Sequence, residues 1–227
     1  MNKVLKAFWS RAKDSYDLKE LERLGLTPTL EQREMILSLI AMIFKWNKAA
    51  GLVSPKDEGV LFLRHFCDSL QPLLLFGFKK RATLLDIGAG GGFPSIPICI
   101  FRPDLTFILA ESNKKKAAFL NEVKKEINGT NVEVFSGRLE ALAKEGKKFD
   151  YVVSRGLGTL KKFAAMAKPF ILPDGHMYTF KAKNFQAELE EVTVGKDTEG
   201  IRIAEIAEYD LANQILGLKL VSLELFN

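Results

Sequence analysis

The 227-residue chain is poor in the residue types that form disulfides and metal sites, with two cysteines and two histidines. Cys67 and Cys99 both lie in apolar segments with helical spacing, so the sequence predicts buried thiols and no bound metal. No apolar run reaches the roughly 18 to 20 residues that a membrane-spanning helix needs. The N-terminus continues into charged residues and not into a signal-peptide core. These absences favour a soluble, cytoplasmic protein without a membrane partner.

Charge is unevenly distributed along the chain. Residues 1–187 contain 30 Lys and Arg against 19 Asp and Glu, whereas residues 188–227 contain 3 against 9. The body of the chain is therefore more basic than the net charge of +5 indicates. An excess of positive charge favours a polyanionic partner, although a solvated surface is the alternative explanation.

The first third of the chain has helical spacing of apolar residues and no strand alternation. Thr29 and Gln32 form a capping-box pattern that begins a predicted helix ending near Asn47. A second helix is predicted over residues 57–76, bent or interrupted near Pro72. We expect residues 1–80 to form a helical extension that packs on a core domain of residues 81–227.

The core domain alternates predicted strands and helices. Strands are expected at residues 83–87, 106–111, 132–136, 149–154 and 176–182, with helices at 94–101, 114–127, 139–144, 160–168 and 185–194. This alternation predicts an α/β fold with a doubly wound, mostly parallel sheet. Two further β-rich segments, 201–209 and 216–226, would add an antiparallel edge.

A glycine-rich loop follows the first predicted strand. The third glycine of the dinucleotide fingerprint would fall on Phe93, which disfavours an NAD-dependent oxidoreductase. The spacing Asp86-x-Gly88-x-Gly90-x-Gly92 instead resembles the first motif of methyltransferases that use S-adenosylmethionine (SAM). A purely structural turn is the alternative.

Three later strand ends offer further candidates for a nucleoside site. Glu111 ends the second strand about twenty residues after the loop, where a carboxylate can bind ribose hydroxyls or else cap the next helix. Leu139 and Glu140 follow the third strand, where an adenine ring would lie. Arg155 ends the fourth strand and could contact the methionine carboxylate, an RNA phosphate or a nearby acid.

The predicted helix at residues 57–76 has a polar stripe. Arg64, His65, Asp68, Ser69 and Gln71 share one side of an ideal helix, and Arg64 and Asp68 are spaced to pair. The stripe either faces the cofactor cleft or is a solvated surface.

Three lysines, Lys114, Lys115 and Lys116, begin the helix after Glu111. Cations at a helix N-terminus oppose the helix dipole, by roughly 0.3–1 kcal/mol each. A sequence that carries this cost indicates a phosphate-binding edge, with a salt-screened surface as the alternative.

Five motifs occur in the order that is typical of one family. The sequence resembles the RsmG (GidB) family of bacterial 16S rRNA guanine-N7 methyltransferases in Arg64-His65-Phe66-x-Asp68-Ser69-Leu70, Leu85-Asp86-Ile87-Gly88-Ala89-Gly90-Gly91-Gly92-Phe93-Pro94-x-Ile96-Pro97, Glu111-x-x-x-Lys115-Lys116-x-x-Phe119-Leu120, Arg138-x-Glu140 and Phe149-Asp150-x-Val152-x-Ser154-Arg155. The resemblance covers about residues 30–185.

The resemblance implies a class I SAM-dependent methyltransferase that modifies N7 of a guanine, the 527 position, in the 530 loop of 16S rRNA. It implies SAM contacts from Asp86, Gly88, Gly90, Phe93, Glu111, Leu139, Glu140 and Arg155. Arg155, His65 and Asp68 would position the base or the cofactor, with no general base. RNA contacts would come from Lys114, Lys115, Lys116, Arg64 and Ser69. The partner would be 16S rRNA or the 30S subunit, and the protein a monomer.

The chain also departs from the family pattern. Gly51-Leu52-Val53 stands where Asn-Leu-Thr is usual, Ser95 and Gly156 replace a glycine and an alanine, and Lys181-Ala182-Lys183 stands where Lys-Gly is expected. Two rival functions are a SAM methyltransferase for a small molecule or protein, and a ribosome-binding protein with a vestigial cofactor pocket.

Overall fold

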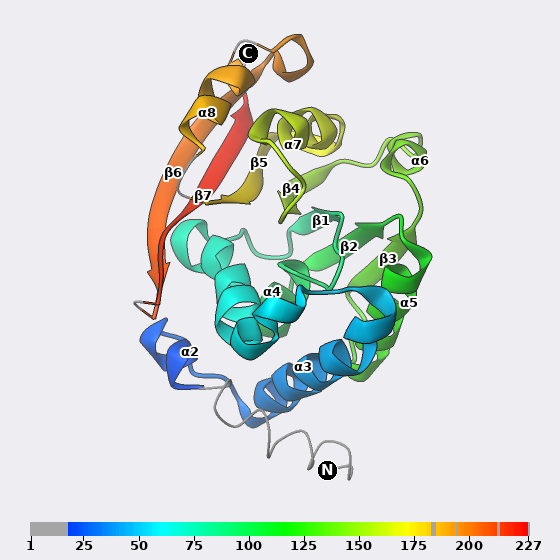
Figure 1. Cartoon of the computed structure of the whole chain (residues 1–227). Coiled ribbons are helices and arrows are strands. Elements are labelled where there is room, and N and C mark those ends of the chain that lie inside the picture. Colours follow the sequence, from blue (N-terminus) through cyan, green and yellow to red (C-terminus); the bar gives the residue numbers. More distant parts are fainter. Residues whose placement is uncertain (1–17, 183–184, 194, 213, 227) are drawn as a thin grey trace.

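A computed structural model describes residues 18–182, 185–193, 195–212 and 214–226. Its seven-stranded sheet has the order β3-β2-β1-β4-β5-β7-β6 (Figure 1). The strands are β1 (Thr83–Ile87), β2 (Thr106–Glu111), β3 (Val132–Ser136), β4 (Phe149–Ser154), β5 (Ile171–Lys181), β6 (Ile201–Leu211) and β7 (Ile215–Leu225). Strands β1 to β5 pair in parallel, and β7 is antiparallel to both β5 and β6. The predicted parallel sheet with an antiparallel edge is confirmed.

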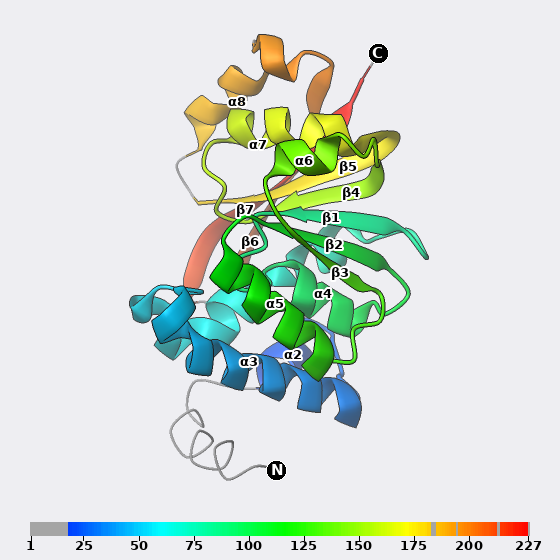
Figure 2. The same cartoon turned by 90° about the vertical axis from the view of Figure 1, so that its right-hand side faces the viewer.

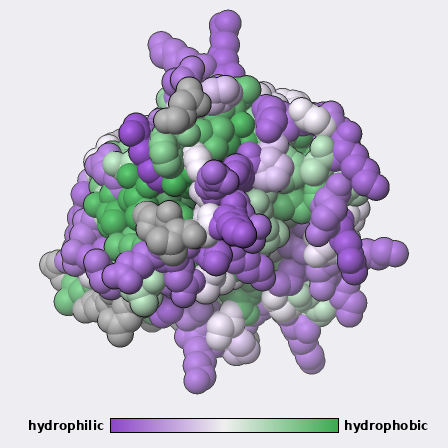
Figure 3. Space-filling model, turned by 90° about the horizontal axis from the view of Figure 1, so that it is seen from above, coloured by the Kyte–Doolittle hydropathy of each residue, from purple (hydrophilic) through white to green (hydrophobic). Residues whose placement is uncertain are grey.

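Helices cover both faces of the sheet (Figure 2). One face carries α3 (Leu30–Ala50), α4 (Ser95–Phe101) and α5 (Lys114–Glu126), and the other carries α6 (Leu139–Ala143), α7 (Leu160–Ala167) and α8 (Gln186–Thr193). Alternate residues of β1 point into different cores: Leu84 packs on the α3 side, and Leu85 and Ile87 pack on the α7 side. Strands buried on both faces explain the nearly continuous apolar runs in the sequence. Seen from above, hydrophobic areas lie between projecting hydrophilic side chains (Figure 3), as is normal for a water-facing surface.

The N-terminal helices share a core with the sheet. Leu21 in α2 (Lys19–Arg23), Ile36 and Leu39 in α3, and Leu84 in β1 belong to one cluster of buried residues. Thr29 caps α3 with the predicted capping box, and Gly51 ends the helix in the left-handed conformation. The helical extension is predicted to begin at residue 1, and its residues 1–17 lie outside the described residues. Residue 194, the last of the predicted helix 185–194, also lies outside them.

The segment predicted as one helix over residues 57–76 is less regular than expected. It begins as a 3₁₀ helix, η1 (Pro55–Val60), and contains two π-helical stretches, η2 (Phe62–Cys67) and η3 (Pro72–Phe76). Side chains satisfy two main-chain carbonyls there, with Ser69 donating to His65 and Gln71 to Cys67. Such π turns change which side chains share a face, and they occur often at functional sites.

Strand β5 begins five residues before its predicted start, at Ile171. Its register against β4 shifts between Phe149 and Tyr151. A Cβ atom on Gly175 would lie 2.8 Å from the carbonyl oxygen of Asp150, so the strands approach closely where only glycine fits. Within the described ranges, no helix is both long and apolar enough to cross a bilayer.

Candidate functional site

The glycine loop connects β1 to α4 at the carboxyl edge of the parallel strands. Gly88, Gly90 and Gly92 have φ angles of 73°, 54° and 86°, a region that other residues rarely adopt. The amides of Gly88 and Ala89 donate to the carbonyl of Ala110 at 2.9 and 3.2 Å, which ties the loop to β2. Pro94 lies at the N-cap of α4, one position before the first helical turn where the sequence predicted it.

Two cavities adjoin this loop. The larger, which we call the cofactor cleft, has a volume of about 380 Å³. Its lining includes Leu52, Arg64, His65, Gly88, Gly90, Phe93, Glu111, Lys116 and Arg155. The second cavity, of about 270 Å³, includes Gly88, Ala110, Arg138, Leu139 and Glu140. Because both contain Gly88, they form neighbouring parts of one site along the strand ends, where ligands bind in folds of this kind.

Glu111 is held against the loop and does not cap the following helix. Its Oε2 atom accepts a hydrogen bond from the Gly90 amide at 2.9 Å, and Oε1 accepts one from the Asn113 amide at 2.7 Å. Asn113 is the residue that caps α5, through the amides of Lys115 and Lys116. Glu111 thus presents a fixed, largely buried carboxylate to the cofactor cleft.

Asp86 lies beneath the glycine loop and is fully buried. Among the described residues, neither of its carboxyl oxygens has a hydrogen-bond partner of normal geometry, and the nearby Ser95 hydroxyl also lacks one. Burial raises the pKa of Asp86 to about 7, an effect that Ser95 moderates and the charge of Glu111 increases. Unlike the other predicted cofactor-binding residues, Asp86 is not part of the lining of either cavity.

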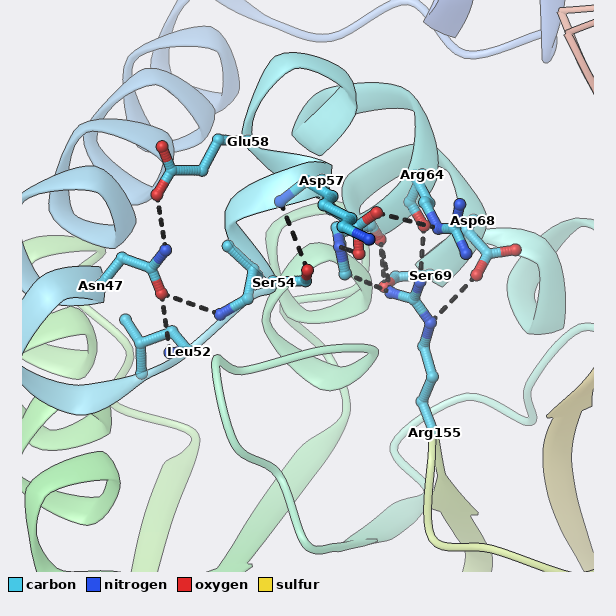
Figure 4. A network of polar contacts seen from close by, with 12 residues as sticks. Asn47, Leu52, Ser54, Asp57, Glu58, Arg64, Asp68, Ser69 and Arg155 are labelled. Carbon is cyan, nitrogen blue, oxygen red and sulfur yellow. Dashed lines mark hydrogen bonds and ion pairs between the residues drawn. The ribbon is translucent and has the colours of Figure 1, made fainter.

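Arg155 is the centre of a polar network between β4 and η2 (Figure 4). Its Nε atom pairs with Oδ2 of Asp68 at 3.0 Å, and its Nη2 donates to the carbonyl of Arg64 at 2.6 Å. The predicted pair of Arg64 with Asp68 is wrong, because Arg64 instead faces Asp57 at 3.5 Å. In the π-helical segment, Arg64 and Asp68 do not have the relative positions of a regular helix, and Arg155, which follows β4, pairs with Asp68 instead.

Asp68 has a second partner that sequence reasoning missed. The hydroxyl of Tyr209, in β6, donates to Oδ1 of Asp68 at 2.6 Å. Burial raises the pKa of Asp68, while the Arg155 guanidinium and the Tyr209 hydrogen bond oppose that rise. No local pattern pointed to Tyr209, because it lies 141 residues from Asp68 in the chain.

His65 is held between Arg155 and Asp57. Its Nδ1 lies 3.0 Å from Nη1 of Arg155, and its Nε2 lies 3.3 Å from Oδ2 of Asp57. Burial and then the charge of Arg155 lower the pKa of His65 to about 4, although Asp57 opposes the change. At neutral pH the ring is therefore uncharged, and since Arg155 has only donors, Nδ1 is the acceptor and Nε2–H faces Asp57. A side chain engaged in this way suits positioning more than proton transfer.

The predicted RNA contacts differ in accessibility. Lys114 and Lys115 are exposed, and Arg64 is about half exposed, with 53% of its side chain accessible. Lys116 is partly buried and lines the cofactor cleft. Ser69 is fully buried and donates to the His65 carbonyl, so a direct contact with RNA does not agree with its location.

The loop after α3 forms one wall of the cofactor cleft. Buried Asn47 accepts hydrogen bonds from the amides of Leu52 and Val53 at 2.8 and 3.0 Å, and donates to Glu58 at 2.7 Å (Figure 4). Leu52 is thereby held over Gly91, where a Cβ atom would lie 3.4 Å from the Leu52 carbonyl oxygen. Sequence analysis missed Asn47, although its position before a helix-ending glycine is a usable signal.

The site fits a cofactor of the SAM type. The glycine cradle and the fixed carboxylate of Glu111, both in the lining of the cofactor cleft, match a ligand that carries a nucleoside. Within the described residues, no three His, Cys, Asp or Glu side chains are grouped to hold a metal ion.

Comparisons with known proteins show the family of the chain. The family model described as rRNA small subunit methyltransferase G matches residues 32–212. Ribosomal RNA small subunit methyltransferase G of Staphylococcus haemolyticus is 30% identical over 195 residues, or 85% of this chain and 81% of that protein. The Geotalea uraniireducens protein of the same name is 35% identical over 189 residues, covering 83% and 85%.

A solved structure supports the fold class. The mitomycin 7-O-methyltransferase MmcR has a TM-score of 0.56 at 12% identity, over 87% of this chain and 69% of that chain. The predicted class I methyltransferase fold is thus confirmed.

Proposed function

The chain belongs to the rRNA small subunit methyltransferase G family, and we propose that it transfers a methyl group from SAM to N7 of a guanine, the 527 position, in the 530 loop of 16S rRNA. The observation that carries this proposal is the cofactor cleft, in which the glycine loop and Glu111 meet at the carboxyl edge of the sheet. A vestigial cofactor pocket is disfavoured because hydrogen bonds hold Glu111 and Arg155 in place at the cofactor cleft.

Particular residues would hold each part of the cofactor. The carboxylate of Glu111 would accept the ribose hydroxyls, and Leu139 and Glu140 would flank the adenine in the second cavity. Gly88, Gly90 and Phe93 would line the methionine part, next to Arg155. When bound, SAM supplies a methyl group on a sulfonium, which is a strongly activated leaving group.

The chain's own contribution is orientation and exclusion of water. Guanine N7 carries an in-plane lone pair, so no general base is needed. An in-line displacement gains most from a fixed geometry in a desolvated pocket. The uncharged His65 and the paired Arg155 and Asp68 are suited to this positioning role.

The proposed partner is 16S rRNA, free or within the 30S subunit. The exposed Lys114 and Lys115 and the half-exposed Arg64 would bind phosphates near the cleft. The target guanine would lie in an accessible loop or be extruded, since the deep major groove of A-form RNA hides N7. We further propose a cytoplasmic monomer, with the helices within residues 1–80 closing one side of the site above the domain of residues 81–227.

Transfer of labelled methyl from SAM tests the function directly. The acceptors are 30S subunits and free 16S rRNA from a strain that lacks the modification, and the product is mapped by chemical cleavage at 7-methylguanine. We expect incorporation at a single guanine of the 530 loop. Intact SAM binding without incorporation would show that the substrate is a different one, and no SAM binding would refute the enzymatic function.

A further inference from the structure

A third cavity, of about 220 Å³, lies on the far side of Arg155 from the glycine loop. Its lining includes Asp68, Arg155, Phe180, Tyr209, Ile215 and Leu218, and we call it the base pocket. Three of its walls come from different parts of the chain, since Asp68 follows η2, Phe180 lies near the end of β5, and Tyr209 lies in β6.

The base pocket adjoins the cofactor cleft directly. Arg64, Arg155 and Gly156 line both cavities, so the Arg155 side chain forms a shared wall. The cavity of Leu139 and Glu140 adjoins the cleft at Gly88 and is suited to the adenine of the cofactor. The acceptor of the methyl group must approach the cofactor from a side that the adenine does not occupy. The base pocket adjoins the cofactor cleft on such a side.

The chemistry of the base pocket suits a flat, polar ring. Phe180 is half buried, and the Arg155 guanidinium lies 5.9 Å from the centre of its ring. Ile215 and Leu218 add apolar side chains, and the buried Asp68 and Tyr209 add polar groups. Enzymes that act on an extruded base hold it in this way, between aromatic or apolar side chains with polar contacts at its edge.

Hydrogen bonds make the polar wall rigid. Tyr209 donates to Asp68 at 2.6 Å, and Asp68 pairs with Arg155 at 3.0 Å. Arg155 also donates to the Arg64 carbonyl, so its guanidinium has little freedom to swing into either cavity. A wall fixed from both sides can hold two ligands in one mutual orientation.

We propose that the base pocket receives the target nucleobase, stacked on Phe180, with Tyr209 and Asp68 holding Arg155 as the wall between the base and the cofactor. This inference rests on the proposed function. The glycine loop and the cofactor cleft hold the cofactor, and the base pocket would hold the acceptor ring.

The first test changes the stacking surface without emptying the pocket. Phe180→Leu keeps an apolar side chain but loses the aromatic face, and Phe180→Tyr keeps that face. We expect Phe180→Leu to lower kcat/KM for the rRNA about 5- to 150-fold, the range for stacking of one base on an aromatic side chain. Phe180→Tyr should restore most of this loss, and the Kd for SAM should stay within about twofold of wild type in both.

A second pair of variants blocks the pocket with bulk. Ala182 is exposed and belongs to the lining of the base pocket, whereas Ala204 in β6 is also exposed but does not belong to it. Ala182→Trp should lower methylation with SAM binding unchanged, and the matched control Ala204→Trp should methylate as wild type does.

Binding of GMP, with S-adenosylhomocysteine filling the cofactor cleft, gives a readout independent of catalysis. We expect nuclear Overhauser effects between guanine H8 and the methyl protons of Ile215 and Leu218. If wild type methylates rRNA and both Phe180→Leu and Ala182→Trp do so equally well, the base pocket is refuted. It is refuted too if these variants lose SAM affinity as much as they lose methylation. If wild type methylates no rRNA, the nuclear Overhauser effects decide: their presence keeps the base pocket while the proposed substrate falls, and their absence overturns both.

Discussion

The hydrogen bond from Tyr209 to Asp68 leads to a prediction about stability that can be worked out quantitatively. The hydroxyl donates at 2.6 Å to the carboxyl of Asp68, a residue that is only 5% exposed. A hydrogen bond to a charged group contributes about 1.5–3 kcal/mol. Tyr209→Phe removes the donor and keeps the ring, so we expect the free energy of unfolding to fall by about that amount at pH 7.

The pH dependence of this loss follows from the pKa of Asp68, which burial raises above its ordinary value. A carboxyl with a raised folded-state pKa contributes most to stability below its unfolded-state pKa. That contribution is lost as the pH rises through the folded-state pKa. The Tyr209 bond limits the loss because it stabilises the ionised form. The effect of Tyr209→Phe should therefore shrink, to about 0.5–1.5 kcal/mol, when the pH is low enough to protonate Asp68.

Urea unfolding followed by circular dichroism, at a series of pH values, measures both quantities. Tyr178→Phe is the matched control, since Tyr178 is also buried and its hydroxyl makes no hydrogen bond with another described residue. Equal stability losses for the two variants at every pH would refute the inference that Tyr209 supports an ionised Asp68.

Three further predictions concern residues in and around the cofactor cleft. Glu111→Ala should weaken SAM binding about tenfold or more in calorimetry. Lys115→Ala should leave SAM affinity unchanged and lower the salt dependence of RNA binding by about one phosphate contact. Equal losses of SAM affinity in the two variants would contradict the separation of cofactor and RNA sites. Burial raises the pKa of Asp86 to about 7, so wild type without cofactor should lose stability as the pH rises toward and through 7, and Asp86→Asn should remove that loss in thermal unfolding. Gly92→Ala should lower the free energy of unfolding by about 1–3 kcal/mol, because φ is 86° and the new Cβ would lie 2.7 Å from a side-chain atom of α4. In the control Gly146→Ala the new Cβ meets no atom within 4 Å, so only the smaller backbone effect on stability is expected.

The regular elements of the core could be predicted because their signals are local. Strands β1 to β4 have the predicted bounds, since each is a short apolar run flanked by charged or turn-forming residues. The segment 57–76 and the start of β5 could not be predicted in this way. A π turn depends on tertiary contacts that reward an irregular backbone, and Gly175 in β5 fits a close approach to Asp150 that only the paired strands reveal.

In the candidate site, too, the residues with local sequence signals could be predicted and those that depend on distant contacts could not. Gly88 and Gly90 lie in the loop after the predicted strand 83–87, and Glu111 ends the predicted strand 106–111, so the rule that ligands bind at carboxyl strand ends was enough to bring them together. The partner of Arg64 was mispredicted because ideal helical spacing was applied to a π-helical segment. Tyr209 could not be predicted, because nothing in the sequence around it indicates a contact with Asp68, which lies 141 residues away in the chain.

The network around Arg155 links the cofactor cleft to the antiparallel edge of the sheet. Arg155 follows β4, Asp68 follows η2, and Tyr209 belongs to β6 at the edge of the sheet. Because Asp68 is buried, its charge depends on both partners, and loss of either leaves a buried carboxylate short of a hydrogen bond. The antiparallel edge therefore does more than extend the sheet. Without β6, Asp68 would lose its tyrosine donor, and the geometry of Arg155 at the wall of the cofactor cleft would change even though no residue of β6 lines that cleft.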